Sequence, residues 1–280
     1  MNRPLLFVLL ASLFLTSFAC QPNKLDEALD AITQAINNHR GEEPFHVTNA
    51  FPELEESSCY QIQGKLVHAF YPPNTIAGYK AAVTSSSAMS LLKTDHPASG
   101  YLLKEGWVSA GDTILSAAFS RPFIEVELGY YLRETVQEPI QDIAQLKDLI
   151  LGVVPVIELP DLGFSDQKDW TLANFIVHNA AAKQFISGSP KPLEAMGDVN
   201  SLLCVLVKDG VELGQAKAND ALGDQWKALQ WLINHRIEQG DEIGPQHLLI
   251  TGSLGQLFPF EAGQYEVSYG ELGQLDFVIQ

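Results

Sequence analysis

Hydrophobic positions recur along the chain with two different spacings. Between residues 23 and 40, and again over Asp224–Arg236, they recur every three to four positions, which predicts amphipathic helices. Phe123–Leu132 alternates apolar and polar side chains as strands do, and Val153–Leu159 is an almost continuous apolar run typical of a strand buried on both faces. Lys208-Asp209-Gly210 joins two further apolar runs and predicts a β-hairpin.

The remaining segments are shorter, and their order indicates the fold class. We expect a helix over Leu54–Gln63 and strands over four segments: Leu66–Phe70, Ile76–Thr84, Leu248–Thr251 and Tyr265–Tyr269. The sequence contains no internal repeat and no coiled-coil heptads. We therefore predict an α+β protein, with a helical segment over residues 20–75 and a strand-rich domain over residues 76–280.

The first nineteen residues have the pattern of a secretory signal peptide. A basic start at Arg3 precedes the apolar run Leu5–Leu15, which is too short to span a bilayer comfortably. Ser17-Phe18-Ala19 suits ordinary cleavage, and the same residues before Cys20 are similar to a bacterial lipobox, although Ser17 stands where Leu is usual. We expect an exported, periplasmic protein, attached to the membrane only through a lipid on Cys20 if the lipobox interpretation holds.

Composition narrows the function classes. The chain has 17 Lys+Arg against 34 Asp+Glu, a net charge of −17, which argues against a nucleic-acid role because phosphate contacts need a basic surface. Hydrophobic residues make up 46%, which excludes a disordered chain. Cys59 and Cys204 could form one disulfide, but Cys204 lies in an apolar run and is more simply a buried apolar side chain.

Three glutamates are candidates for metal binding. Glu125 and Glu127 are two apart in a predicted strand, so their side chains face the same side. Adjacent carboxylates repel unless a cation or solvent separates them, and oxygen ligands suit Mg²⁺ or Mn²⁺. A solvated strand face is the alternative. Glu158 ends an apolar strand, where a carboxylate must be paired, protonated or bound to metal.

Several short motifs resemble the 2-keto-4-pentenoate hydratase family, within the fumarylacetoacetate hydrolase superfamily. Their order and separation match over most of the chain after the signal segment. The motifs are Phe51-Pro52-Glu53-Leu54, Gly78-Tyr79-Lys80 with Val83-Thr84-Ser85, Ile124-Glu125-Val126-Glu127-Leu128, Val156-Ile157-Glu158-Leu159-Pro160-Asp161, and Leu249-Ile250-Thr251-Gly252-Ser253 with Glu261-Ala262-Gly263-Gln264.

The resemblance implies a fold, a reaction and a set of roles. The fold would be the mixed β-sheet roll of the superfamily's C-terminal domain. Glu125, Glu127 and Glu158 would bind Mg²⁺ or Mn²⁺, and the ion would chelate a small 2-oxo acid and stabilise its enolate. Lys80 would hold the substrate carboxylate or stabilise its developing charge, although an ordinary surface lysine is the alternative. The substrate-binding residues would be Thr84, Ser85 and Thr251, and family members commonly assemble as homo-oligomers.

Departures from the family pattern leave the reaction open. The family's acidic proton-transfer residue is missing from Pro97-Ala98-Ser99-Gly100, and Asp95 or His96 could replace it. His178 stands where the family has an acid, and it is either a second catalytic residue or a helix histidine without a catalytic role. A hydratase is our first expectation. A 2-oxo acid decarboxylase or carbon–carbon hydrolase, or a non-catalytic ligand-binding lipoprotein, are the alternatives.

Overall fold

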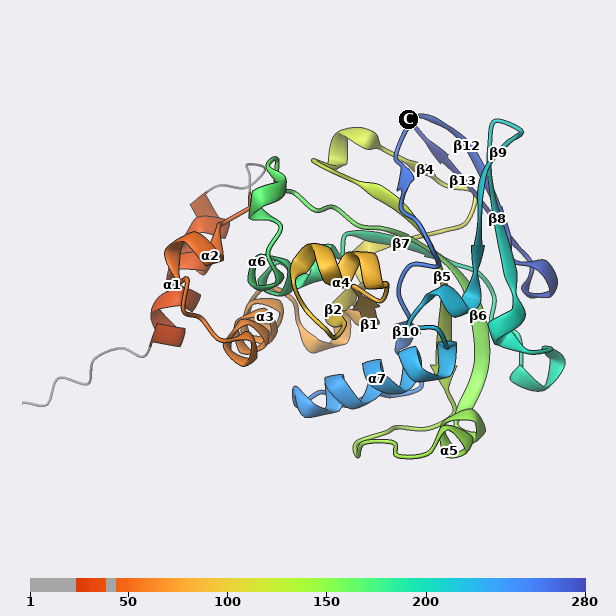
Figure 1. Ribbon diagram of the computed structural model, residues 1–280, viewed down its shortest axis with the longest axis horizontal. Helices are drawn as coiled ribbons and strands as arrows, with labels where there is room; N and C mark the ends of the chain where they lie inside the picture. The colour runs from red at the N-terminus through yellow and green to blue at the C-terminus, as the bar shows by residue number, and fades with distance from the viewer. Residues whose placement is uncertain (1–23, 39–43) are drawn as a thin grey trace, which may run out of the picture.

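Two β-sheets form the body of the protein in the computed structural model, which describes residues 24–38 and 44–280 (Figure 1). The predicted signal peptide and Cys20 lie outside these ranges. The helices are α1 (Lys24–Asn38), α2 (Val47–Ala50), α3 (Glu56–Phe70), α4 (Ser86–Leu92), α5 (Ile143–Asp148), α6 (Leu172–Val177) and α7 (Gln225–Glu238). Among the described residues, no helix is both long and apolar enough to cross a membrane.

The larger sheet carries the predicted carboxylate strands at its centre. Its order is β2-β1-β10-β5-β6-β7-β3, and β11 also pairs with β5. Its strands are β1 (Ile76–Ala82), β2 (Ala98–Leu103), β3 (Trp107–Val108), β5 (Phe123–Leu132), β6 (Ile150–Leu159), β7 (Gln184–Ser187), β10 (Leu248–Ile250) and β11 (Phe258–Pro259). The pairs β1–β10 and β3–β7 are parallel and the others antiparallel, so the sheet is mixed, as predicted.

The second sheet has the order β4-β13-β12-β8-β9. Its strands are β4 (Thr113–Ile114), β8 (Leu203–Lys208), β9 (Val211–Lys217), β12 (Gly263–Ser268) and β13 (Gln274–Ile279). The predicted hairpin is the β8–β9 pair, with Asp209 and Gly210 at positive φ in the turn. Apolar side chains from both sheets and α7 make up the largest buried cluster, which includes Val126, Leu206, Leu232 and Phe277.

One predicted strand is wrong. Leu66–Phe70 is the last part of α3, not a strand. The buried positions explain why: Leu66 and Val67 are adjacent and both buried, one helical turn beyond Ile62 and Gln63. A strand would bury alternate residues, whereas a helix buries neighbours at intervals of three and four. Gly64 and Lys65 interrupt the apolar pattern after Gln63, so the sequence alone does not show that the helix continues to Phe70.

The N-terminal helices pack on the strand domain and share its interior. Side chains of α1, α3 and α6 form one apolar cluster together with Ala82, the last residue of β1, and Val83. The three helices lie on the same side of the molecule (Figure 1). Cys59 lies in this cluster and Cys204 in the larger one. Both thiols are buried and free, so Cys204 is a buried apolar side chain and the two do not form a disulfide here.

Candidate metal and substrate site

The antiparallel pairing of β5 with β6 brings the three predicted glutamates together. Glu125 lies directly opposite Glu158 in the register, and Glu127 projects from the same face as Glu125 two residues further along β5. Each of the three offers a carboxylate oxygen, and these oxygens lie within 4.8 Å of one another. Three carboxylates at this separation form the type of oxygen ligand set that divalent cations take in proteins.

Burial makes this cluster electrostatically unfavourable without a cation. Glu127 and Glu158 have exposed fractions of 0%. Burial, with repulsion from Glu158 and Glu125, raises the pKa of Glu127 well above its usual value. Burial likewise raises the pKa of Glu158 to about 7, although Lys80 opposes the shift. Glu127 Oε1 and Glu158 Oε2 have no hydrogen-bond partner among the described residues, which leaves both oxygens available as ligands.

Lys80 is the buried cation of the site and not a surface lysine. Its Nζ lies 2.5 Å from Glu158 Oε1 and donates a hydrogen bond to the Ala180 carbonyl at 3.0 Å. Burial lowers the pKa of Lys80, but the charges of Glu158, Glu125 and Glu127 together raise it above its usual value. The ammonium is therefore charged and held in one place, with one N–H left for a ligand.

A strained turn supplies the carbonyl that holds Lys80. Three consecutive non-glycine residues, Asn179, Ala180 and Ala181, have φ between 51° and 59°. Such a run is costly, and it persists only where its surroundings fix it. The Asn179 side chain does so, because it accepts from the Tyr101 N–H at 2.7 Å and donates to the Tyr101 carbonyl at 2.9 Å.

Gly252 orients Glu127 from the turn after β10. Its N–H donates to Glu127 Oε2 at 2.9 Å. Its φ is +96°, and a Cβ at this position would clash with the side chain of Thr84. Both facts require glycine here, because other residues rarely adopt this backbone conformation. The peptide at Gly252 thus donates to one carboxylate oxygen and leaves the other free.

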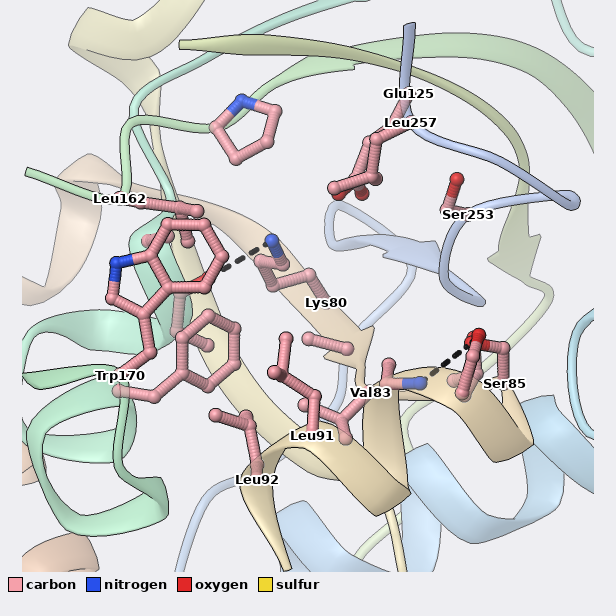
Figure 2. Close-up of a pocket in the computed structure, with 18 of the residues that line it drawn as sticks. Lys80, Val83, Ser85, Leu91, Leu92, Glu125, Leu162, Trp170, Ser253 and Leu257 are labelled. Carbon is pink, nitrogen blue, oxygen red and sulfur yellow. Dashed lines mark hydrogen bonds between the residues drawn. The ribbon is translucent and has the colours of Figure 1, made fainter. Parts of the chain in front are cut away.

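A cavity of about 400 Å³ opens beside Lys80 and Glu125 (Figure 2). Of the predicted site residues, Lys80, Thr84, Ser85, Glu125 and His178 line it. The Ser85 hydroxyl accepts from the Ala88 N–H at 3.2 Å and so caps α4. The cavity therefore joins the carboxylate cluster to the start of α4 and to α6.

Thr251, the third predicted substrate-binding residue, is not among the residues that line the cavity. Its hydroxyl is buried and bonded to the Leu128 carbonyl at 3.2 Å and to Gln225 Oε1 at 2.7 Å. Ser253 reaches the cavity instead, and its buried Oγ has no hydrogen-bond partner among the described residues. The positive φ of Gly252 turns the chain between the two, and only the glycine in Thr251-Gly252-Ser253 signals this turn in the sequence.

His178 contacts the cavity but has one ring nitrogen already occupied. Its Nε2 donates to the Phe45 carbonyl at 2.8 Å, and its ring packs edge-on against Phe164. Burial lowers the pKa of His178, with the Phe45 bond opposing the shift. The imidazole is therefore neutral near pH 7, and Nδ1 is the atom left to exchange a proton.

The residues near Pro97-Ala98-Ser99-Gly100, where the resembled family has an acidic proton-transfer residue, lie away from the cavity. Ser99 is fully buried, where its hydroxyl accepts from Arg236 at 3.1 Å and contacts His235 Nδ1 at 3.0 Å. The Asp95 side chain is fully exposed, and His96 lies 3.3 Å from Glu56. Neither of the two residues considered as replacements, Asp95 and His96, lines the cavity, and neither Ala98 nor Ser99 does.

Sequence relatives of the chain are enzymes that act on 2-oxo acids. It is 26% identical over 220 residues to 4-oxalocrotonate decarboxylase of Pseudomonas sp. (strain CF600), covering 78% of this chain and 82% of the relative. It is 24% identical over 249 residues to 2-keto-4-pentenoate hydratase of Paraburkholderia xenovorans (strain LB400), covering 86% of this chain and 89% of the relative. No family model matches the sequence.

Solved structures share the fold. The 4-oxalocrotonate decarboxylase of Pseudomonas putida G7, complexed with magnesium and adipate, superposes with a TM-score of 0.82 at 23% identity, over 92% of this chain and 97% of that one. The chain therefore has the mixed α+β fold of these structures, and a putative fumarylacetoacetate hydrolase family protein of Yersinia pestis CO92 shares it with a TM-score of 0.56 at 12% identity, over 72% of this chain and 92% of that one. The resemblance to the 2-keto-4-pentenoate hydratase family is confirmed, because the curated relatives are hydratases and decarboxylases of 2-oxo acids.

Proposed function

We propose that the protein is a divalent-metal-dependent lyase that acts on a 2-oxo acid, with hydration of a 2-keto-4-pentenoate-type substrate as its reaction. The observation that carries this proposal is the buried carboxylate cluster, in which Glu127 Oε1 and Glu158 Oε2 lack a hydrogen-bond partner among the described residues. Three carboxylates beside one ammonium leave an excess of negative charge that a divalent cation would neutralise.

Mg²⁺ fits the donor set, because all three donors are carboxylate oxygens, and Mn²⁺ fits the same set. Glu125, Glu127 and Glu158 would hold the ion. When bound, it supplies a Lewis acid that stabilises the negative charge developing on a 2-oxo acid. A magnesium complex of the structurally similar decarboxylase supports this choice.

The chain's own residues bind the substrate and move its proton. Lys80 has one N–H free of Glu158 and Ala180, which would hold the substrate carboxylate. The unpaired Ser253 hydroxyl can bind a second substrate oxygen. Neutral His178, through Nδ1, would accept the proton that leaves the substrate carbon. Ala180, by holding Lys80, keeps this arrangement fixed before the substrate binds.

The metal site can be tested on the purified protein by thermal or urea unfolding. Millimolar Mg²⁺ or Mn²⁺ should stabilise the wild type by about 2.7 kcal/mol at 100 times the dissociation constant. Glu127→Ala should abolish this gain, whereas Glu266→Ala, at an exposed position of β12, should retain it. An equal metal response in the wild type and in Glu127→Ala would refute the proposed ligand set.

Turnover needs a separate test with a substrate panel. The absorbance of 2-hydroxy-2,4-pentadienoate should fall in the presence of protein and Mg²⁺, and this loss should disappear in Lys80→Met. Metal binding without turnover of any 2-oxo acid in the panel would favour a non-catalytic ligand-binding protein.

Decarboxylation is the second candidate reaction, and one observation favours it. Ser99 and Ala98, which replace the family's acid, are buried away from the cavity, so water addition lacks that proton-transfer group. Loss of CO₂ from a 2-oxo acid needs mainly stabilisation of the resulting negative charge, which the same cluster would supply with its ion. Release of CO₂ from 4-oxalocrotonate, without a hydrated product by mass spectrometry, would select this reaction.

We also propose that the protein is exported, on the basis of the apolar run before Cys20. Labelled palmitate should attach to the wild type in a bacterial host and be lost in Cys20→Ser. Label retained by the variant would eliminate the lipoprotein interpretation, while a cleaved but unlabelled wild type would indicate plain secretion.

A further inference from the structure

The cavity beside the carboxylate cluster has two chemically different ends. Figure 2 shows Glu125 and Ser253 on one side of Lys80, and Trp170 and Leu162 on the other. The first end has the charges and hydroxyl that would bind the polar head of a 2-oxo acid. The second end receives whatever substituent the acid carries beyond its 2-oxo group.

The second end is lined by large apolar side chains. Leu91 and Leu92 come from α4, Phe175 from α6, and Leu162, Phe164 and Trp170 from the segment between β6 and α6. Together these side chains offer much more apolar surface than is needed to cover the three-carbon alkenyl group of a 2-keto-4-pentenoate. A volume of about 400 Å³ falls within the range of about 300–1,000 Å³ seen for pockets that bury drug-sized ligands.

A second carboxylate has no cationic partner at this end. Among the described residues that line the cavity, Lys80 is the one lysine or arginine, and it already contacts Glu158 and Ala180. Arg121 stacks over Trp170 with its guanidinium carbon 5.5 Å from the ring centroid, but it does not line the cavity. Its Nη1 donates to the Phe164 carbonyl at 2.8 Å and to that of Ser165. A buried carboxylate without a partner is costly, so this end excludes it.

Two half-exposed leucines line the same cavity, Leu91 from α4 and Leu257 beside Glu125 (Figure 2). Leu91 is 45% exposed and Leu257 is 44% exposed, and both line the cavity. Single exposed leucines are common on protein surfaces, but Leu91 adjoins Leu92 and so extends the apolar wall of the second end outwards. An apolar chain that reaches beyond this end would continue to bury surface against Leu91.

We propose that the substrate is a monocarboxylic 2-oxo acid with a long or bulky apolar tail, bound with its head at Lys80 and the carboxylate cluster and its tail against Trp170, Phe175 and Leu91. This proposal rests on the proposed function and specifies its substrate class. It predicts a larger substrate than the five-carbon acid of the hydratase name, and one without the second carboxylate of a dioate.

The test compares three 2-oxo acids on the Mg²⁺-loaded wild type by isothermal titration calorimetry: 2-oxobutyrate, 2-oxooctanoate and 2-oxooctanedioate. Affinity should rise about fourfold for each added methylene, since burial of one methylene is worth about 0.8 kcal/mol. 2-Oxooctanoate, which is four methylenes longer, should therefore bind about 250-fold more tightly than 2-oxobutyrate. 2-Oxooctanedioate, of equal length, should bind at least about tenfold more weakly than 2-oxooctanoate.

A charge placed in the apolar end should reverse this preference. Leu91→Arg should weaken 2-oxooctanoate and strengthen 2-oxooctanedioate by about tenfold each, because a guanidinium can pair with the distal carboxylate. Leu203→Arg is the matched control, because Leu203 is 42% exposed and lies on β8, outside the cavity. The control should leave all three affinities unchanged.

Failure of this proposal and failure of the proposed function give different results. If all three acids bind with similar affinity, or the dioate binds best, the function stands and the apolar-tail proposal is overturned. If none of the three binds with Mg²⁺ present, the proposed function has failed, and the tail preference fails with it.

Discussion

Lys80 and Arg236 are both about 1% exposed, but their surroundings differ. Arg236, on α7, faces one carboxylate: its Nε donates to Asp241 at 2.8 Å and its Nη2 also pairs with Asp241. Its Nη1 donates to Gln63 at 3.0 Å and to Ser99 at 3.1 Å, and the guanidinium carbon lies 4.1 Å from the Tyr101 ring centroid. Charge and hydrogen bonds are both satisfied there.

Lys80 faces three carboxylates instead of one, and two of their oxygens lack partners among the described residues. The two clusters lie on opposite faces of β1, because Tyr79 and Lys80 are consecutive strand residues and Tyr79 lies 5.3 Å from the Arg236 guanidinium carbon. One face therefore stabilises the fold, while the other leaves negative charge and open ligand positions, which is what a binding site requires.

Replacement of Arg236, whose charge and hydrogen bonds are all satisfied, should have the largest effect on stability. Arg236→Met leaves Asp241 buried without its partner, and breaking a buried pair in this way costs about 3–5 kcal/mol. Urea unfolding without metal should show this loss, with an unchanged m-value if only stability is altered. A loss below about 1 kcal/mol would mean that this cluster does not hold α7 on the sheet.

Gly252→Ala should have the next largest effect on stability, because Gly252 packs against Thr84 and holds Glu127 of the carboxylate cluster. The left-handed φ of +96° and the clash with Thr84 should together cost about 2–3 kcal/mol. Gly111→Ala is the matched control, since Gly111 has a φ of +84° and nothing within 4 Å of its Cβ position. The control should lose only about 1 kcal/mol from the backbone term. Equal losses in both would mean that packing against Thr84 contributes nothing.

Glu127→Gln should have the opposite effect on stability to Arg236→Met. Glu127→Gln replaces one ionisable carboxyl of the carboxylate cluster with a neutral amide, while keeping an acceptor for the Gly252 N–H. Without metal it should stabilise the protein by about 1–3 kcal/mol, the scale of an unsatisfied buried group, as measured by urea unfolding. Glu266→Gln, at an exposed position, should change nothing. Destabilisation by Glu127→Gln would show that the apo cluster is already well compensated.

These clusters also show what the sequence could and could not predict. Glu125 and Glu127 were recognisable because strand periodicity fixes their common face, and Glu158 because a carboxylate interrupts an apolar run. Lys80 was identified only through the family motif, since its partner Ala180 is 100 residues away and meets it through a left-handed turn. Ser253 was missed because one glycine φ decides whether it or Thr251 faces the cavity. Long-range packing and turn geometry, not local pattern, determine these contacts.

The smallest effect on stability should come from an arginine-to-methionine substitution in an exposed ion pair, that of Arg133 with Glu194. Arg133 Nη2 lies 2.6 Å from Glu194 Oε1, a contact as direct as those of Arg236 with Asp241, but the two side chains are 44% and 70% exposed. Solvent screens this pair and little desolvation was required to form it, so Arg133→Met should cost less than about 1 kcal/mol in urea unfolding. Both pairs are within hydrogen-bond distance, so distance alone predicts similar contributions from them. A loss at Arg133 equal to that at Arg236 would therefore show that contact distance, and not burial, determines what a charged pair contributes in this protein.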